Sequence, residues 1–493
     1  NLLQEGEEYL LLINLESGND VIYYYTRIVE MPNAHVDESL KFVKEFHNTT
    51  FNSETSGTLS TYMEKTTGDN TTLQFVSLNS SLKQLAWADF NGEQLTTPVP
   101  SIKEITDTYN VIVLDYVVTS IGEGGESEYY NVEEYYRVRY TSSRMYLLNF
   151  ERRMNQIFRG ENASFFDNYI ELGIRSGNVE YQANETGTTV AFVQEGELWS
   201  YNETENTLAK VFSFRGYEGI DNRENYGEHD IKIVRIDEAG SLDYIVYGYM
   251  NRGNHEGEVG AAVYYYRAER NVATEEIFVP ADISYEMLKK QLDRLSYVNK
   301  QREMYLYLNE NLCKVDIETG TTTVIRESIP EDCFVVSESQ ESIAWMDADN
   351  ASSAMNITVM NLESGETQRF AADDGQKIRA LGFINEDFVY GMANDSDILK
   401  DISGNEVFAM HTVRIASIDG NVKKEYHQDG YYVTGVSISD GLLELDRVVR
   451  QENGYADAPE DHIMNGEQQS QELVTGRLAT VDDRREQQFL LEF

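Results

Sequence analysis

A short strand–turn–strand pattern recurs along the chain and dominates its order of apolar and polar positions. The clearest copies cover residues 11–18, 311–320 and 357–366, each an apolar strand followed by an acidic or amide turn that ends at glycine. The starts of successive looser copies are separated by intervals near or above the spacing of about 40 to 50 residues that is typical of four-stranded blades. Apolar strands on either side of a glycine turn predict a β-hairpin. The sequence therefore predicts an all-β fold built from repeated hairpins.

A second element precedes several of these hairpins. Residues 184–192, 337–345 and 437–445 share a polar turn followed by a strand with alternating apolar residues. This element resembles the S-x-D-G-x-x-I-A-F repeat of TolB-like propellers, within the superfamily of WD-type β-propeller repeats. The resemblance covers most of residues 180–450 and implies four-stranded antiparallel blades around an axis. Because its motifs are structural, it implies a fold and no activity.

The repeat count favours a β-propeller of eight blades, with seven as the alternative. At 493 residues the chain exceeds the usual single-core limit of about 250 to 300 residues. A propeller avoids that limit because it stacks small cores around an axis. We therefore expect one propeller domain over residues 1–493, with its ring closed by the strand near 10–15 and the last strand, 487–493.

Two helical insertions and two polar loops interrupt the predicted strands. Apolar residues at helical spacing predict short helices near 37–47 and 284–295, and Ser284 is a suitable N-cap for the second. Residues 121–131 and 451–472 are polar and predict long loops. Long loops on a rigid scaffold are common places for binding.

The charge of the chain excludes some partners. Its 85 acidic residues exceed its 40 basic residues, for a net charge of −45. Such a protein repels nucleic-acid phosphates and anionic membrane surfaces. We therefore expect neither nucleic-acid binding nor direct binding of anionic membranes.

The first residue is Asn1 rather than methionine, and the composition is acidic, rich in tyrosine and asparagine, and poor in cysteine. This composition is typical of the outer face of a bacterial cell envelope. We expect an extracellular or cell-surface protein, anchored in the membrane through a segment that precedes this chain. Cys313 and Cys333 are too few for a disulfide framework, and either form one bridge or serve as small buried hydrophobic residues.

No motif predicts a catalytic residue or a cofactor site. The G-x-S-x-G turn of serine hydrolases is absent, and the seven histidines show no zinc-binding spacing. Two acidic loops are candidates for calcium, through Asp347 and Asp349 and through Asp395 and Asp397. Neither loop has the full EF-hand spacing, so solvated turns are the alternative.

These observations favour a non-enzymatic extracytoplasmic propeller that binds a protein or a cell-envelope glycan or peptide through a loop-lined face. Exposed tyrosines beside carboxylates suit such ligands. The alternative is a carbohydrate-active enzyme that uses Asp and Glu residues facing the central channel. A cluster of carboxylates with perturbed pKa values in a pocket would favour the enzyme.

Overall fold

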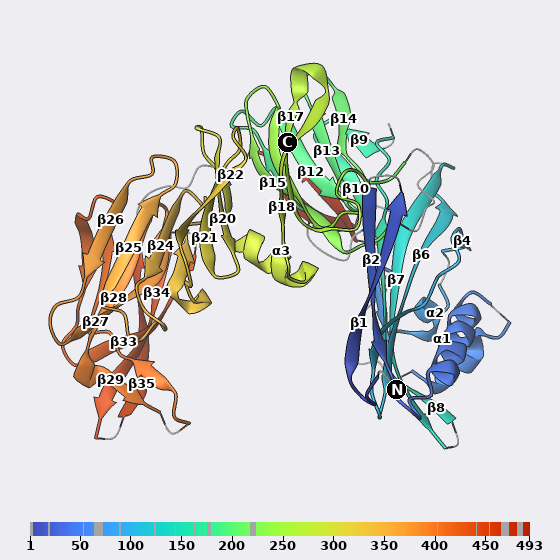
Figure 1. Ribbon diagram of the computed structural model, residues 1–493, viewed down its shortest axis with the longest axis horizontal. Coiled ribbons are helices and arrows are strands. Elements are labelled where there is room, and N and C mark those ends of the chain that lie inside the picture. Colours follow the sequence, from blue (N-terminus) through green and yellow to red (C-terminus); the bar gives the residue numbers. More distant parts are fainter. Residues whose placement is uncertain are drawn as a thin grey trace. The chain divides into compact units, whose positions relative to one another are not determined.

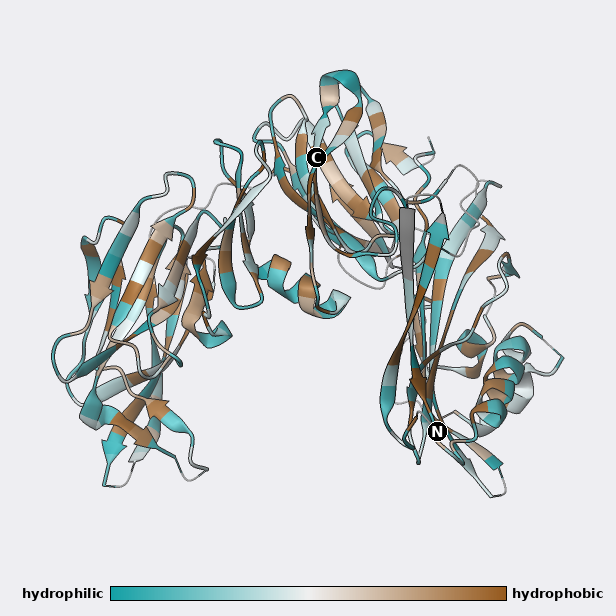
Figure 2. Cartoon of the chain, viewed as in Figure 1, coloured by the Kyte–Doolittle hydropathy of each residue, from teal (hydrophilic) through white to brown (hydrophobic). Residues whose placement is uncertain are grey.

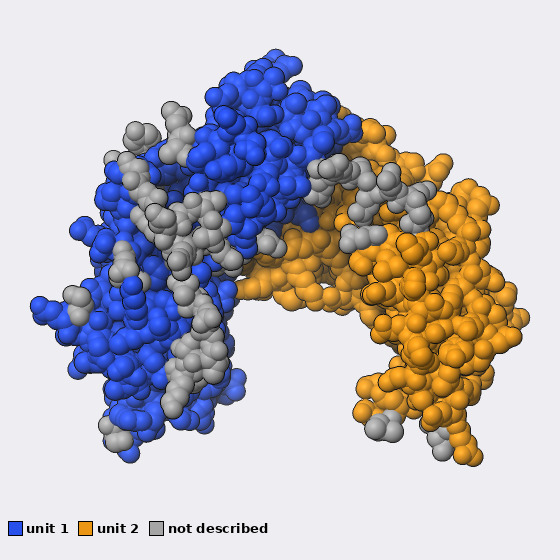
Figure 3. Space-filling view, turned by 180° about the vertical axis from the view of Figure 1, so that it is seen from behind, with its two compact units in different colours: residues 1–259, 265–273, 472–493 blue, residues 260–264, 274–471 orange. Residues whose placement is uncertain are grey.

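The computed structural model describes residues 3–17, 20–52, 54–63, 72–87, 90–122, 125–142, 144–161, 164–174, 179–216, 223–401, 403–439, 441–452, 454–464, 473–480 and 487–493. Most of its regular structure is β-strand, with a few short helices (Figure 1). Figure 3 colours the two compact units into which the chain divides. The sequence predicts a single domain. Unit 1 comprises Asn1–Val259, Tyr265–Ala273 and Glu472–Phe493, and unit 2 comprises Gly260–Tyr264 and Thr274–Gln471.

The N-terminal part of unit 1 contains an antiparallel sheet with the order β3-β8-β7-β6-β4, in which β5 also pairs with β6. Its strands alternate between buried and more exposed residues, so one face of the sheet lies in a hydrophobic core. Its strands are β3 (Phe75–Ser77), β4 (Glu93–Gln94), β5 (Ser101–Ile105), β6 (Asn110–Ile121), β7 (Ser127–Thr141) and β8 (Arg144–Gln156).

Helices contribute to the core on the buried face of this sheet. Helix α1 (Val36–Thr50) covers the range 37–47, where the sequence predicts a helix, and its buried Val43 and Phe46 join the core of the sheet. The brown and teal residues of α1 in Figure 2 show its amphipathic character. The 3-10 helix η1 (Ser56–Thr61) and the short helix α2 (Leu82–Leu85) complete this layer.

The first two strands form a separate two-stranded hairpin. Strand β1 (Glu8–Ser17) pairs with β2 (Asp20–Val29) in an antiparallel register without a bulge, from the pair of Glu8 and Val29 to the pair of Ser17 and Asp20. The repeat at residues 11–18 is therefore a hairpin, as predicted, but it is not part of a blade.

The rest of unit 1 contains two complete four-stranded sheets, and a third includes residues of both units. The first has the order β36-β37-β10-β9 and the other two follow the sequence. The strands are β9 (Phe165–Phe166), β10 (Tyr169–Ile174), β36 (Thr475–Thr480), β37 (Gln487–Glu492), β11 (Tyr181–Ala183), β12 (Thr189–Gln194), β13 (Glu197–Asn202), β14 (Thr207–Phe212), β15 (His229–Ile236), β16 (Leu242–Tyr249), β17 (Val259–Arg267) and β18 (Val272–Pro280), with the 3-10 helix η3 (Ala268–Arg270).

Unit 2 contains three further four-stranded sheets, a three-stranded sheet and the small hairpin β29-β30. Helix α3 (Tyr285–Arg294) lies in the range 284–295 that the sequence predicts, and Ser284 caps its N-terminus. The strands and 3-10 helices are β19 (Ser296–Val298), β20 (Glu303–Leu308), β21 (Asn311–Asp316), β22 (Thr321–Arg326), η4 (Glu331–Cys333), β23 (Phe334–Val336), β24 (Ser342–Met346), β25 (Asn356–Asn361), β26 (Thr367–Ala371), β27 (Gln376–Ile384), β28 (Asp387–Asn394), η5 (Asp395–Asp397), β29 (Ile398–Lys400), β30 (Glu406–Phe408), β31 (Thr412–Ala416), β32 (Val422–Tyr426), β33 (Tyr431–Ser439), β34 (Leu442–Gln451) and β35 (Gly454–Met464).

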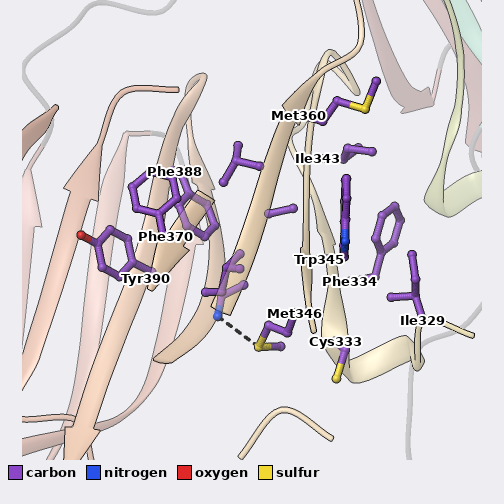
Figure 4. Close-up of a cluster of buried hydrophobic side chains, with 14 of the residues drawn as sticks. Ile329, Cys333, Phe334, Ile343, Trp345, Met346, Met360, Phe370, Phe388 and Tyr390 are labelled. Atoms are coloured by element: carbon purple, nitrogen blue, oxygen red, sulfur yellow. Dashed lines mark hydrogen bonds between the residues drawn. The ribbon is translucent and has the colours of Figure 1, made fainter. Parts of the chain in front are cut away.

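One hydrophobic core runs through three successive sheets of unit 2. Tyr307 of β20, Trp345 of β24 and Phe388 of β28 all belong to it. In the close-up, Trp345 lies beside Phe334, its register partner on β23 (Figure 4). Sheets that share a continuous core are typical of stacked repeats, because a single sheet cannot bury both of its faces.

The repeated four-stranded antiparallel sheets are consistent with a propeller. The described residues form six such sheets, so the predicted count of eight blades is not confirmed, and no closed ring is seen among them. The expected closure by residues 10–15 is wrong, since β37 pairs with β36 and β10 while β1 pairs with β2.

The two predicted polar loops also differ from the structure. Much of 121–131 lies in β6 and β7, which continue to Ile121 and resume at Ser127. Residues 454–464 form strand β35, and the remainder of 451–472 lies partly outside the described residues. Pro459 and the acidic residues around it suggested a loop, but an edge strand tolerates proline because its outer N–H groups need no partner.

Candidate functional site

Strand β1 exposes a run of apolar side chains that only Asn14 interrupts. Leu10, Leu11, Leu12, Ile13 and Leu15 are each between 39 and 69% exposed. Because successive side chains of a strand point to opposite faces, both faces of β1 are apolar and both meet solvent. Continuous apolar runs are typical of strands buried on both faces. The composition of β1 is therefore that of an interior strand, whereas its surroundings are those of a surface strand.

Strand β2 connects this hairpin to the rest of unit 1. Arg27 lies 3.2 Å from the carboxylate of Glu8 and donates a hydrogen bond to the carbonyl of Lys103 on β5. Tyr24 donates to Glu256 at 3.2 Å, and the ring of Tyr25 lies edge-on to that of Tyr249 at 6.2 Å. Among the described residues, these contacts hold β2 against the unit and leave β1 as the outer strand.

Carboxylates and tyrosines gather beside β2, and we call this group the tyrosine–carboxylate cluster. Asp115 of β6 and Glu133 of β7 are direct register partners, on the face of the sheet opposite α1. Lys103 Nζ lies 3.5 Å from Glu228 Oε1. Three segments far apart in sequence, namely the hairpin, the first sheet and the chain around 228–256, meet here. The members of the cluster are Tyr24, Tyr25, Lys103, Asp115, Glu133, Glu228, Tyr249 and Glu256.

Burial and the negative charges of Glu133 and Glu228 raise the pKa of Asp115 to about 6, although Lys103 partly opposes this rise. Burial and Glu228 also raise the pKa of Tyr25. The side chains of Asp115 and Glu133 are nevertheless exposed to solvent. A carboxyl group with a pKa near 6 can exchange a proton near neutral pH, which is the property required of a general acid.

The opposite face of the same sheet contains a buried network of charged and polar groups, which we call the Glu134 network. Glu134 accepts hydrogen bonds from Tyr116 at 2.9 Å and Tyr136 at 2.7 Å, and its Oε2 lies 2.8 Å from His47 Nδ1. Arg152, the register partner of Glu134, donates to backbone carbonyls of α2 at 2.7 and 3.1 Å.

The partners in this network determine its protonation. Burial alone would raise the pKa of Glu134, but His47 and Arg152 outweigh burial and the pKa is lowered. Burial alone would lower the pKa of His47, but the bond to Glu134 outweighs it and the pKa is raised. The charged forms are therefore favoured inside the core. Glu134, His47 and Arg152 are almost completely inaccessible to solvent, so the network serves the fold rather than a substrate.

The four calcium candidates lie in two separate loops, and three of them have basic or amide partners. Asp347 lies 3.4 Å from Arg326, Asp395 lies 3.8 Å from Lys377, and the buried Asp397 accepts from Arg450 and, at 2.7 Å, from Asn394. Asp349 lies in the turn after β24. Among the described residues, no group of three or more His, Cys, Asp or Glu side chains is arranged to hold a metal ion.

Cys313 and Cys333 are both free thiols, so the bridge that the sequence left open is not formed. In the part of the chain that the structure describes, no helix is long and apolar enough to cross a membrane.

Sequence reasoning missed the tyrosine–carboxylate cluster and the Glu134 network. A signal for the network was present: Tyr130, Val132, Tyr136 and Val138 alternate as inward-facing residues, and Glu134 occupies the position between them. No comparable signal marked Asp115, because Glu228, which contributes to its raised pKa, comes from a distant segment.

Comparisons with known proteins add little to this description. No protein-family model and no curated protein matches the chain. Among solved structures, a chain of the mitotic checkpoint complex is similar over 62% of this chain and 87% of its own length, at 10% identity and a TM-score of 0.27. The acylaminoacyl peptidase of Pyrococcus horikoshii matches over 77% of this chain and 55% of its own, at 9% identity and a TM-score of 0.28. A Bacteroides thetaiotaomicron protein of unknown function matches over 81% and 98%, at 9% identity and a TM-score of 0.23. Similarities at this level carry no argument about function.

Proposed function

We propose that this chain is a non-enzymatic, extracytoplasmic binding protein whose partner docks on the β1–β2 hairpin. The partner is a protein or a glycan or peptide of the cell envelope. The observation that carries the proposal is the exposure of apolar side chains on both faces of β1. Contiguous apolar surface rimmed by polar residues marks interaction sites on soluble proteins.

A comparison of binding to cell-envelope fractions tests this proposal. Leu10→Ser and Leu12→Ser together make one face of β1 polar. The matched control is Val324→Ser with Val422→Ser, which alters exposed apolar residues on strands of unit 2. We expect purified envelope proteins or peptidoglycan fragments to be retained by the wild type and the control and lost by the hairpin variant. Equal retention by all three proteins would refute docking on the hairpin.

The second candidate function is a carbohydrate-active enzyme, favoured by the raised pKa of Asp115 beside Glu133. In this mechanism Asp115 would protonate the leaving oxygen of a glycoside and Glu133 would serve as the second carboxylate. Asp115→Asn should then lower hydrolysis of aryl glycosides or polysaccharides by about 10²- to 10⁴-fold. If the wild type hydrolyses none of a broad panel of these substrates, the enzymatic alternative fails and the binding function is unaffected.

A further inference from the structure

The outer edge of β1 is an open hydrogen-bonding edge. Among the described residues, β1 and β2 form a sheet of two strands, paired continuously and without a bulge. Alternate residues of an antiparallel strand direct their N–H and C=O groups away from the partner strand. On β1 these groups point outward along the apolar run Tyr9–Leu15, a template about 23 Å long at about 3.3 Å per residue.

Natural proteins protect such edges with proline, lysine, charged side chains or bulges. Two edge strands of unit 2 show this protection. Strand β32 carries Lys423 and Lys424 near its centre, and β35 carries Pro459 among acidic residues. Between Tyr9 and Leu15, β1 contains no charged residue, proline or glycine. The edge of β1 therefore lacks the protection that β32 and β35 carry.

The ends of the run indicate what kind of strand fits there. Exposed glutamates border it on both sides, at Glu7 and Glu8 before it and Glu16 after it. A second copy pairing antiparallel about Leu12 would place Glu8 opposite Glu16, and like charges directly opposite are destabilising. Both copies would also carry a net charge of −45. A strand with lysine or arginine at its ends would instead meet these glutamates with opposite charge.

Resting on the proposed function of the hairpin, we infer that β1 accepts an added β-strand from a partner protein. The partner segment is extended, apolar at consecutive positions and basic at both ends. Its main chain pairs with the open edge of β1, and its side chains lie beside Leu10 and Leu12 on one face and Leu11 and Ile13 on the other. The consecutive apolar residues follow from the apolar character of both faces of β1.

Peptides with matched apolar runs test this inference on the full chain. Each peptide carries a run as long as Tyr9–Leu15, ending in lysines in one peptide and in glutamates in the other, and a third peptide adds a central proline to the lysine version. By fluorescence anisotropy, we expect the lysine peptide to bind at least about tenfold more tightly than the glutamate peptide, because complementary charge selects partners. The proline peptide should not bind, since proline removes a donor from the added strand.

Two variants locate the binding on the chain. Leu12→Lys places a charge in the middle of the edge and should abolish binding of the lysine peptide. Glu16→Lys reverses the charge at one end and should narrow or reverse the preference for lysine over glutamate. The matched control Val422→Lys makes the same kind of change on β32 and should leave binding unchanged.

Each contrary result has a separate meaning. Failure of every peptide to bind overturns strand addition, while the proposed function survives if the hairpin variant still loses its envelope partner. If sedimentation shows a dimer of the wild type that Leu12→Lys dissociates, the edge is occupied by a second copy and the inference is wrong. Binding of the wild type, but not of Leu12→Lys, to zwitterionic lipid vesicles would assign the apolar run to a membrane surface and would also overturn it.

Discussion

Removing the negative charge of Glu134 should destabilise the N-terminal sheet strongly. Glu134 is fully buried and balances the buried Arg152 and the charge that it favours on His47. Glu134→Gln keeps the size of the side chain and one acceptor oxygen. It breaks the buried pair with His47 and removes the carboxylate that favours the charge of Arg152, and breaking a buried ion pair typically costs about 3–5 kcal/mol.

The expected loss of stability can be measured for the whole protein and for the individual strands. A loss of about 3 kcal/mol lowers the melting temperature by roughly 6–12 °C, at about 2–4 °C per kcal/mol for a domain of about 150–250 residues. Hydrogen exchange followed by mass spectrometry should show faster exchange across β6, β7 and β8. The matched control is Glu133→Gln, the same chemical change on the neighbouring residue, which points to the exposed face. It should leave exchange in these strands unchanged.

A double substitution tests the reasoning behind this magnitude. Arg152→Met removes the charge that Glu134→Gln leaves unpaired, so the double variant should lose less stability than the sum of the two single losses. Two results would refute the argument: a Glu134→Gln protein as stable as the wild type, or strictly additive losses in the double variant. The first would mean that Glu134 is not charged in the folded protein, and the second that the two groups are not coupled.

Three further predictions concern other parts of the chain. The pKa of Glu134 is lowered by folding, so its contribution to stability is complete above its ordinary pKa of 4.5 and is lost as the pH falls through its pKa in the folded protein. The pKa of His47 is raised by folding, so its contribution to stability is complete below its ordinary pKa of 6.5 and is lost as the pH rises through its pKa in the folded protein. The protection of amides in β6–β8, relative to their intrinsic exchange rate at each pH, should therefore be greatest between about pH 4.5 and 6.5, and this optimum should disappear in Glu134→Gln. Ser284→Ala removes the cap that accepts from the Met287 N–H and should cost about 1 kcal/mol in thermal unfolding, whereas Ser284→Asp should restore most of it. In the native protein iodoacetamide should label Cys313 before Cys333, because Cys333 is fully buried and its thiol pKa is raised to about 12; equal labelling rates would contradict this.

The sequence predicted those features that short stretches of chain determine by themselves. The hairpins at 311–320 and 357–366 occur as β21-β22 and β25-β26, where Gly320 and Gly365 have φ values of +68° and +73°. Glycine adopts this left-handed conformation without strain, so the turn follows from local chemistry. The helix at 284–295 follows in the same way from its apolar spacing and its cap.

The sequence could not predict which strands pair with which. The apolar and polar alternation of β6–β8 is the same as that of blade strands, because alternation reports only that one face is buried. Pattern alone therefore does not distinguish the strands of this sheet from blade strands, although β8 pairs with β3 and β7 outside any four-stranded sheet. The closure was misassigned for the same reason: β37 needs an antiparallel apolar partner, and β10 and β1 satisfy this description equally well.

Two features of unit 1 break the rule that links sequence pattern to burial, and they do so with different consequences. Glu134 places a charge at an inward position, but His47, Tyr116 and Tyr136 satisfy it within the chain. Strand β1 places an interior sequence on the surface, and no described segment covers its open edge. Departures from the local rules are expected where a compensating interaction exists or where function requires them. Since the compensation for Glu134 lies inside the protein, that departure is explained by stability. Among the described residues nothing compensates for the exposed edge of β1, and this difference is why we propose a function for the hairpin and not for the buried network.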